Sequence, residues 1–335
     1  MSERYLPSGE QVALARSIGE SLKAILPLSR LQESPEESAQ TWTVLRDLGV
    51  LGISIPAEHG GSGLGAAEEA IIAVELGRRV VAPSVLATLG AAHLRPENRR
   101  LAAEGDRRFA AGYCRDDRIV FVDDRGANGL LVRYESGARL FALPQSSRMI
   151  DQQLWSIRLH EAVGLGEPLA TAGPGEALRL RLIDAAALAG LARAALDMAV
   201  EYAGVREQFG RPIGSFQAVK HHCANMALAA RCACDQVGFA AIAVDDGRDD
   251  AALQVESAFF VAGSAAIENC GKNIQVHGGI GFSEEAGPHR LLKRARVLVQ
   301  VAGGLEASLM RVAECPAALS SRLTNPDLAA GSKRE

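Results

Sequence analysis

The spacing of apolar and polar residues changes twice along this chain and divides it into three regions. In residues 8–105, apolar positions recur at helical spacing, as in residues 41–48, where Trp42, Leu45 and Leu48 fall on one face. Residues 107–182 hold short β-rich runs separated by Gly, Asn and Ser, and the run ALRLRLID alternates like a half-buried strand. From residue 184 to 312 the helical period returns, in a run that Asp184 is placed to cap.

These periods predict a mainly α fold with a small antiparallel β-domain. We expect an N-terminal helical domain over residues 1–106, a shortened β-domain over 107–182, and a C-terminal four-helix bundle over 183–320. The bundle helices would run to about residue 207, from 217 to 243, from 251 to 270, and through HRLLKRARVL. The segment GVLGISIPAEHGGSGLG is expected to be a loop because of its glycines and proline. The tail, residues 321–335, is expected to be disordered.

Composition narrows the function classes. Of the 335 residues, 48% are apolar and 23% are charged, as in ordinary soluble globular proteins. A net charge of −4 argues against nucleic acid as a partner, since that would require a basic surface. We expect no membrane-spanning run, and the N-terminus lacks the pattern of an export signal, which predicts a cytoplasmic protein. The six cysteines form no Cys-x-x-Cys pair, which predicts reduced thiols and no metal site.

Three segments carry more specific information than the composition. They are YAGVREQFGRPIGSFQ at residues 202–217, QVHGGIGFSEEAGPHRLLKR at 275–294, and the glycine-rich loop at 49–65 followed by AVELGRR. Together and in this order they resemble the acyl-CoA dehydrogenase family, whose helical–β–helical order also matches the pattern above. The resemblance covers most of the first and last thirds of the chain, whereas the middle third matches poorly.

The resemblance implies a set of cofactor-binding residues. In the family each FAD lies across a subunit interface, and its adenosine–pyrophosphate half is held by the neighbouring subunit. A planar cation would bind the pyrophosphate, an aromatic ring would pack beside it, amides would line the groove, and two glycines would let the backbone come close. The matching positions are Arg206, Gln208, Phe209, Ile213, Gln217, Gln275, Gly278 and Gly279. Each also has a plain structural alternative: a solvated helix-end arginine, a core phenylalanine, or a helix-terminating glycine turn.

The catalytic base that the resemblance implies is missing. Family members remove the α-proton of an acyl thioester with a glutamate. The two positions that the family uses for this glutamate fall on Gly303 and near Leu180 in this sequence. The remaining candidates are Glu306, which is placed as a first-turn helix glutamate, and Asp184, which is placed as a cap.

The middle region also departs from the family. FAAGYCRDDRIVFVDD stands where catalytic members carry a segment that holds the flavin ring, and Trp155 lies in a context more typical of packing. This combination resembles the smaller, degenerate subunit of the heteromeric α2β2 acyl-CoA dehydrogenases of bacterial steroid catabolism. It implies a non-catalytic subunit that shares FAD with a catalytic acyl-CoA dehydrogenase subunit, with an acyl-CoA substrate and an electron-transfer flavoprotein as acceptor. Two alternatives stay open: a self-sufficient homo-oligomeric dehydrogenase with an atypical base, and a non-enzymatic assembly protein on the same fold.

Overall fold

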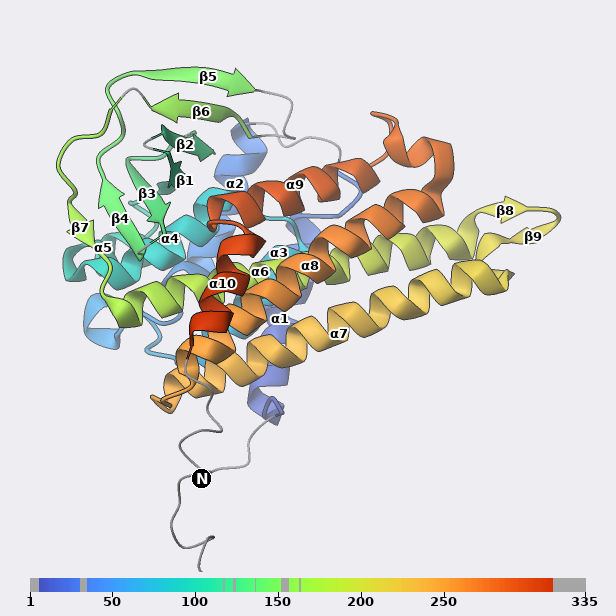
Figure 1. Cartoon of the computed structure of the whole chain (residues 1–335), viewed down its shortest axis with the longest axis horizontal. Helices are drawn as coiled ribbons and strands as arrows, with labels where there is room; N and C mark the ends of the chain where they lie inside the picture. Colours follow the sequence, from blue (N-terminus) through green and yellow to red (C-terminus); the bar gives the residue numbers. More distant parts are fainter. Residues whose placement is uncertain are drawn as a thin grey trace, which may run out of the picture.

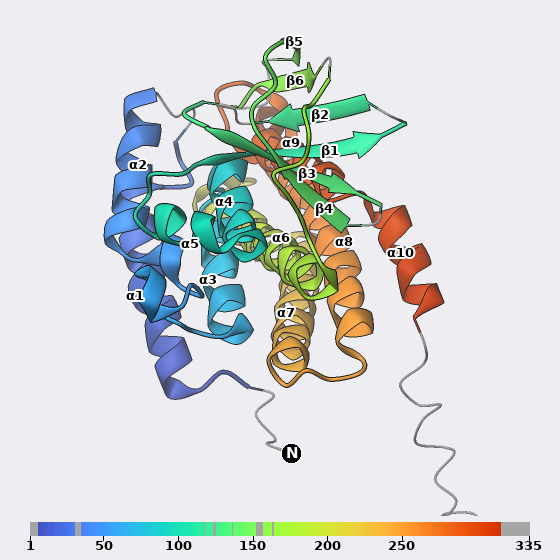
Figure 2. The same ribbon diagram turned by 90° about the vertical axis from the view of Figure 1, so that its left-hand side faces the viewer.

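The computed structural model describes residues 6–30, 35–116, 118–122, 125–135, 137–151, 157–162 and 164–315. Trp155 and the tail at 321–335 lie outside the described residues, so the predictions made for them stay predictions. A small sheet covers one end of a group of long helices, and the shorter N-terminal helices pack along their side (Figures 1 and 2). The molecule is thus mainly helical with a small sheet, as the sequence predicts.

The N-terminal region is helical throughout. It contains α1 (Gly9–Ile25), α2 (Pro35–Asp47), α3 (Ala66–Arg78), α4 (Pro83–Leu94) and α5 (Pro96–Ala103). Ser8 and Gln11 form a capping box at the start of α1, in which each side chain accepts from the other residue's backbone N–H. The predicted glycine-rich loop holds only two short 3₁₀ turns, η1 (Val50–Gly52) and η2 (Ala57–His59).

The β-domain is a seven-stranded sheet. Its strands are β1 (Phe109–Arg115), β2 (Arg118–Val122), β3 (Gly129–Tyr134), β4 (Gly137–Phe141), β5 (Ser147–Asp151), β6 (Leu159–Ala162) and β7 (Ala170–Thr171). The order across the sheet is β5-β6-β2-β1-β3-β4-β7. The neighbouring strands β1 and β3 run parallel, so the prediction of a purely antiparallel sheet is wrong at this pair.

The C-terminal region begins with a helix much longer than predicted. It comprises α6 (Pro174–Val205), α7 (Gln217–Asp245), α8 (Ala251–His277), α9 (Pro288–Val301) and the short α10 (Leu305–Glu314). Because α6 starts at Pro174, the strand predicted for 177–184 is wrong, and Asp184 is an interior helix residue rather than a cap. The reason is that α6 lies at the centre of the molecule and is covered on nearly all sides, so its buried positions do not form a single apolar stripe.

Helices α3 and α6 cross closely at two glycines. A Cβ on Gly77 would stand 2.0 Å from the carbonyl oxygen of Ala187, and a Cβ on Gly190 would stand 1.9 Å from that of Val74. Only glycine permits this separation of the two backbones. The N-terminal helices and the bundle consequently share one continuous apolar core.

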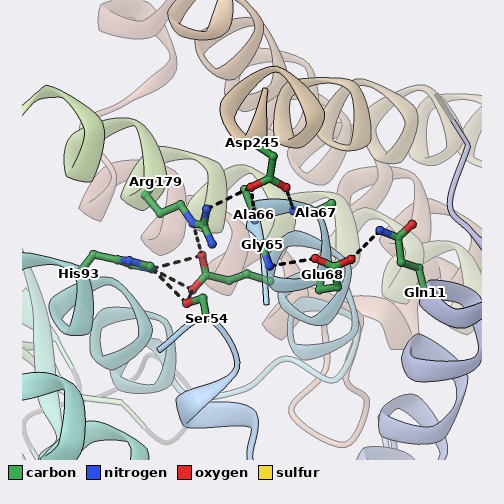
Figure 3. Close-up of polar contacts among 10 residues, drawn as sticks. Gln11, Ser54, Gly65, Ala66, Ala67, Glu68, His93, Arg179 and Asp245 are labelled. Atoms are coloured by element: carbon green, nitrogen blue, oxygen red, sulfur yellow. Dashed lines mark hydrogen bonds and ion pairs between the residues drawn. The ribbon is translucent and has the colours of Figure 1, made fainter. Parts of the chain in front are cut away.

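A buried ion cluster also joins these two regions (Figure 3). The Glu69 carboxylate, 1% exposed, accepts from Ser54 Oγ at 2.6 Å and from Arg179 Nε at 2.6 Å, and lies 2.9 Å from His93 Nε2. Arg179 also faces Asp245 at 3.6 Å, and Asp245 accepts from the first backbone N–H groups of α3. Burial alone would raise the pKa of Glu69, but His93, Arg179 and Ser54 together lower it to about 2.

Helix α7 is more apolar than the sequence prediction of no membrane-spanning run implies. By length and composition alone it could cross a membrane, since an 18-residue window within it has a mean hydropathy of 1.4. This is weak evidence for a membrane span, since core helices of soluble proteins pass the same test. Only 33% of that window is buried within the chain.

Candidate functional site

Two of the three characteristic segments meet at one end of the bundle. The rings of Tyr202 on α6 and His277 on α8 stack at 4.0 Å, which brings the C-terminal ends of these helices together. Beyond them, strands β8 (Glu207–Gln208) and β9 (Arg211–Pro212) form a hairpin that projects from the body of the molecule (Figure 1). The predicted cofactor-binding residues therefore come from two segments that lie side by side.

The hairpin presents a cation and an aromatic ring to the outside. Arg206 ends α6, and its carbonyl accepts from the Ile213 N–H at 2.7 Å. Phe209 has a left-handed backbone, with φ of 55°, and its side chain is 93% exposed. Its ring meets Phe216 edge-on at 6.1 Å. Phe209 is therefore not a core residue.

The Arg206 side chain is exposed and forms no ion pair with any residue that the structure describes. A guanidinium keeps its charge at all physiological pH values and binds phosphate oxygens in pairs. Gln208 and Gln217 are exposed beside it, whereas Ile213 is half-buried and packs against the main core. The hairpin can therefore hold an anion together with a planar ring, as the resemblance predicts.

The second segment adds a backbone of unusual conformation. Helix α8 ends at Gly278, whose φ of 65° and ψ of −143° lie in a region that essentially only glycine adopts. A Cβ on Gly278 or Gly279 would meet no atom within 4 Å, so the space above both residues is open. Gln275 is exposed one turn earlier. These residues fit the adenosine–pyrophosphate half of FAD, which needs a cation, amides and a closely approaching backbone.

The two expected base positions come together at the other end of α6. Gly303 lies in the turn between α9 and α10, and Leu180 is buried in α6. The residue after Leu180, Arg181, donates from Nη1 to the carbonyl of Ala302. Its Nη2 atom lies 3.9 Å from where a Cβ on Gly303 would stand. A guanidinium thus lies at van der Waals distance from the Gly303 position, where the resemblance expects a carboxylate.

Arg181 is held there by a buried network. Its Nε atom lies 3.2 Å from Glu256, which also accepts from Arg311 Nε at 2.9 Å and from Ser308 Oγ at 2.7 Å. The Arg181 guanidinium stacks on the Phe259 ring at 4.3 Å. Burial lowers the pKa of Arg181 to about 10, so the group is still charged at neutral pH. Sequence reasoning missed this network, although its signal is present as two arginines in the apolar start of α6.

The two remaining base candidates differ in their surroundings. Asp184 accepts from Arg133 Nη2 at 2.8 Å, and its side chain is only 16% exposed. Burial raises the pKa of Asp184, while Arg133 and Arg181 oppose that rise. Glu306 is exposed in the first turn of α10, as predicted. The Asp184 carboxylate is thus paired with Arg133, whereas the Glu306 side chain faces solvent.

Possible metal ligands were also sought among the described residues, since the sequence predicts no metal site. Within the described ranges, no three His, Cys, Asp or Glu side chains gather so as to hold a metal ion. The described cysteines are free thiols.

Comparison with known proteins places these features in a family. The model of the acyl-CoA dehydrogenase N-terminal domain matches residues 9–95, and that of the C-terminal domain matches residues 178–315. The acyl-CoA dehydrogenase IpdE2 of Mycobacterium tuberculosis is 30% identical over 272 residues, covering 78% of this chain and 81% of IpdE2. The acyl-CoA dehydrogenase FadE34 of the same organism is 35% identical over 327 residues, covering 88% of this chain.

This chain spans only 45% of the length of FadE34. Among solved structures, the ChsE4–ChsE5 complex from Mycobacterium tuberculosis shares the fold, with a TM-score of 0.73 and 24% identity over 95% of this chain and 100% of the matched chain. The chain therefore belongs to the acyl-CoA dehydrogenase family, flavoprotein oxidoreductases that act on CH–CH bonds of acyl-CoA.

Proposed function

We propose that this chain is the non-catalytic subunit of a heterotetrameric, FAD-dependent acyl-CoA dehydrogenase and completes the FAD site of a catalytic partner. The observation that carries the proposal is the Arg181 guanidinium at the base position, against Gly303. Abstraction of an α-proton needs a carboxylate within hydrogen-bond reach of the substrate. Here glycine stands at the expected position, and the side chain nearest to it among the described residues is a cation that pairs with Glu256.

The retained half-site gives the chain a role despite the lost base. Arg206, Phe209, Gln275, Gly278 and Gly279 would hold the adenosine–pyrophosphate half of a FAD whose ring lies on the partner. FAD supplies the hydride acceptor when it is bound. What this chain contributes is a fixed positive charge, an exposed ring and an open backbone.

The surface around the half-site also supports a partner subunit. Phe209 is 93% exposed and Phe282 is 73% exposed, and Val205 and Ile280 are exposed beside them. Apolar groups gathered in this way at one end of a molecule are typical of a surface that another protein covers. We infer a full-length acyl-CoA dehydrogenase as that protein, an electron-transfer flavoprotein as acceptor, and a bulky acyl-CoA such as a steroid side-chain CoA as substrate.

The first test is the visible absorption spectrum of the purified chain. Expressed alone, it should be colourless; co-expressed with a neighbouring full-length dehydrogenase gene, it should give a yellow complex that oxidises acyl-CoA. Flavin at about one FAD per chain in the protein expressed alone would overturn the proposal. A self-sufficient dehydrogenase would then be the better description.

The second test addresses the half-site directly. Arg206→Ala should strip FAD from the co-expressed complex without changing its circular dichroism spectrum, whereas Arg206→Lys should retain part of the flavin. Arg231→Ala is the matched control, because this exposed arginine lies on α7 and pairs with Asp235. A complex that keeps its full flavin content after Arg206→Ala would remove this residue from the site.

A further inference from the structure

A cavity lies away from the proposed flavin half-site, between α1, α3 and α7, which lie near one another in Figure 2. Its volume is about 890 Å³, within the range of small-molecule sites. We propose that it binds a small amphiphilic carboxylate, with the carboxylate on Arg79 and the apolar body along α3 and α7. This inference does not depend on how the flavin half-site is used.

The shape of the cavity follows from how α1 packs. The buried residues of α1 are Ile18, Gly19 and Leu22, so it is the C-terminal half of this helix that packs closely on α3. The N-terminal half leaves a groove whose lining on α3 runs from Ala67 to Arg79, roughly 18 Å at 1.5 Å per residue. Small and apolar side chains line much of it: Ala67, Ala70, Ile71, Val74, Ala230 and Val237.

The charged group that selects the ligand is Arg79. The residue is only 9% exposed, and its Nε atom is buried without a hydrogen-bond partner. Burial lowers the pKa of Arg79, and the charge of Arg78 lowers it further, while Glu75, Asp197 and Glu20 oppose this. A buried cation is costly, and a ligand carboxylate that reaches the accessible part of the Arg79 side chain in the cavity would compensate for its charge.

Most carboxylates near Arg79 have other partners. Glu20, which also lines the cavity and acts to raise the pKa of Arg79, is exposed, so water screens its charge. Glu75 lies 3.4 Å from Arg193 and 3.8 Å from Arg78. Arg78 in turn binds Asp197 at 2.7 Å. At the far end of the groove, Glu68 accepts from Gln11, and Asp245 accepts from the backbone at the start of α3. Of the arginines described as lining the cavity, Arg16 is exposed and Arg78, Arg193 and Arg231 pair with carboxylates, which leaves Arg79 as the buried cation that a ligand anion would meet.

Dodecanoate is the probe, titrated into the full chain by calorimetry, with dodecyltrimethylammonium as the cationic control of equal tail length. We expect one saturable site for dodecanoate and none for the cation. Arg79→Gln should weaken dodecanoate binding at least tenfold, whereas Arg231→Gln, an exposed and paired arginine on the cavity rim, should not. Equal binding of both amphiphiles, or unchanged binding by Arg79→Gln, would overturn the proposal.

A second variant fills the cavity instead of removing the charge. A Cβ on Gly238 meets no atom within 4 Å, and this residue lines the cavity from α7. Gly238→Phe should therefore abolish dodecanoate binding while the chain keeps its thermal unfolding midpoint. Gly271→Phe on α8 is the control, since its Cβ is equally unobstructed and the residue lies outside the cavity. Retained binding by Gly238→Phe would place dodecanoate elsewhere and refute the assignment.

Two cysteines on α7 offer a readout that needs no substitution. Cys234 lines the cavity, whereas Cys232 is exposed on another side of the same helix. Dodecanoate should slow the alkylation of Cys234 by iodoacetamide, measured by peptide mass spectrometry, and leave Cys232 unchanged. Equal effects on both thiols, or no effect on Cys234 at saturating dodecanoate, would count against the site.

Discussion

The buried carboxylate Glu69 provides the sharpest test of how the N-terminal helices are joined to the bundle. Glu69→Gln keeps the size of the side chain but removes the charge that Arg179 and His93 face. A pKa lowered from 4.5 to about 2 means that folding favours the ionised form by about 3 kcal/mol. Breaking a buried ion pair by removing one partner typically costs about 3–5 kcal/mol. We therefore expect the free energy of unfolding to fall by about 3 kcal/mol or more at pH 7.

The pH dependence of this effect has a definite sign. Because the pKa of Glu69 is lower in the folded chain, its stabilising contribution is complete above the unfolded value of 4.5. That contribution is lost as the pH falls from 4.5 towards 2. The difference in unfolding free energy between wild type and Glu69→Gln should accordingly be constant from pH 7 to 5 and shrink below that.

Urea unfolding followed by circular dichroism at pH 7, 5 and 3.5 measures both quantities. Glu68→Gln is the matched control, since this neighbouring carboxylate is less buried and accepts from the uncharged Gln11 side chain and the Gly65 backbone N–H. It should cost about 1 kcal/mol or less, as for a helix cap. A cost below about 1 kcal/mol for Glu69→Gln at pH 7, or a cost that does not change with pH, would refute the account of the cluster.

Five further substitutions test packing and the site. Gly190→Ala should destabilise the fold by about 3 kcal/mol, measured as a lower thermal unfolding midpoint, because the added Cβ meets the α3 backbone. Gly204→Ala on the same helix is the control. Its Cβ meets no atom within 4 Å, so it should raise stability by up to about 1 kcal/mol in the same scan. Leu22→Ala should cost about 2–5 kcal/mol in urea unfolding, since this side chain is fully buried in the shared core; a smaller loss would mean that α1 packs loosely. Glu256→Gln should cost about 3 kcal/mol by leaving two arginines without their shared carboxylate, and an unchanged midpoint would contradict the network. Phe209→Ala should leave the midpoint of the chain unlowered but reduce the flavin content of the co-expressed complex, and undiminished flavin would exclude a role for the ring.

The sequence predicts the glycine-rich loop from its glycines and proline. It also predicts the approximate positions of α7, α8 and α9, whose buried residues recur mainly at helical spacing. It fails at the start of α6 for a physical reason. Arg179 and Arg181 alternate there with Leu178, Leu180 and Leu182, which is the pattern of a strand with one wet face. In the structure both arginines point into buried ion clusters on a helix that other elements surround. Hydrophobic periodicity reports solvent exposure, so it carries little information about a helix with no solvent face.

The candidate site likewise has a part that the sequence predicts and a part that it does not. Arg206, Phe209 and the glycine pair are candidates from the sequence because they lie in short segments, and the structure places these segments at one end of the bundle. The contact of Arg181 with Glu256 and with the Gly303 position could not be predicted, since these residues are far apart in the chain and meet only through helix packing. The assignment of all these residues to a cofactor or base site stays a prediction.

The left-handed backbone of Phe209 has a consequence for how this surface can change over time. A bulky side chain with φ of 55° is strained, by about 1–2 kcal/mol relative to glycine in that turn. Selection for stability alone would replace the phenylalanine with glycine or asparagine, which adopt this conformation readily. Under the proposed function, cofactor binding compensates for this strain and keeps the ring in place. A lineage that stopped sharing its cofactor would then lose Phe209 early, so this position should separate cofactor-sharing relatives from pure scaffolds.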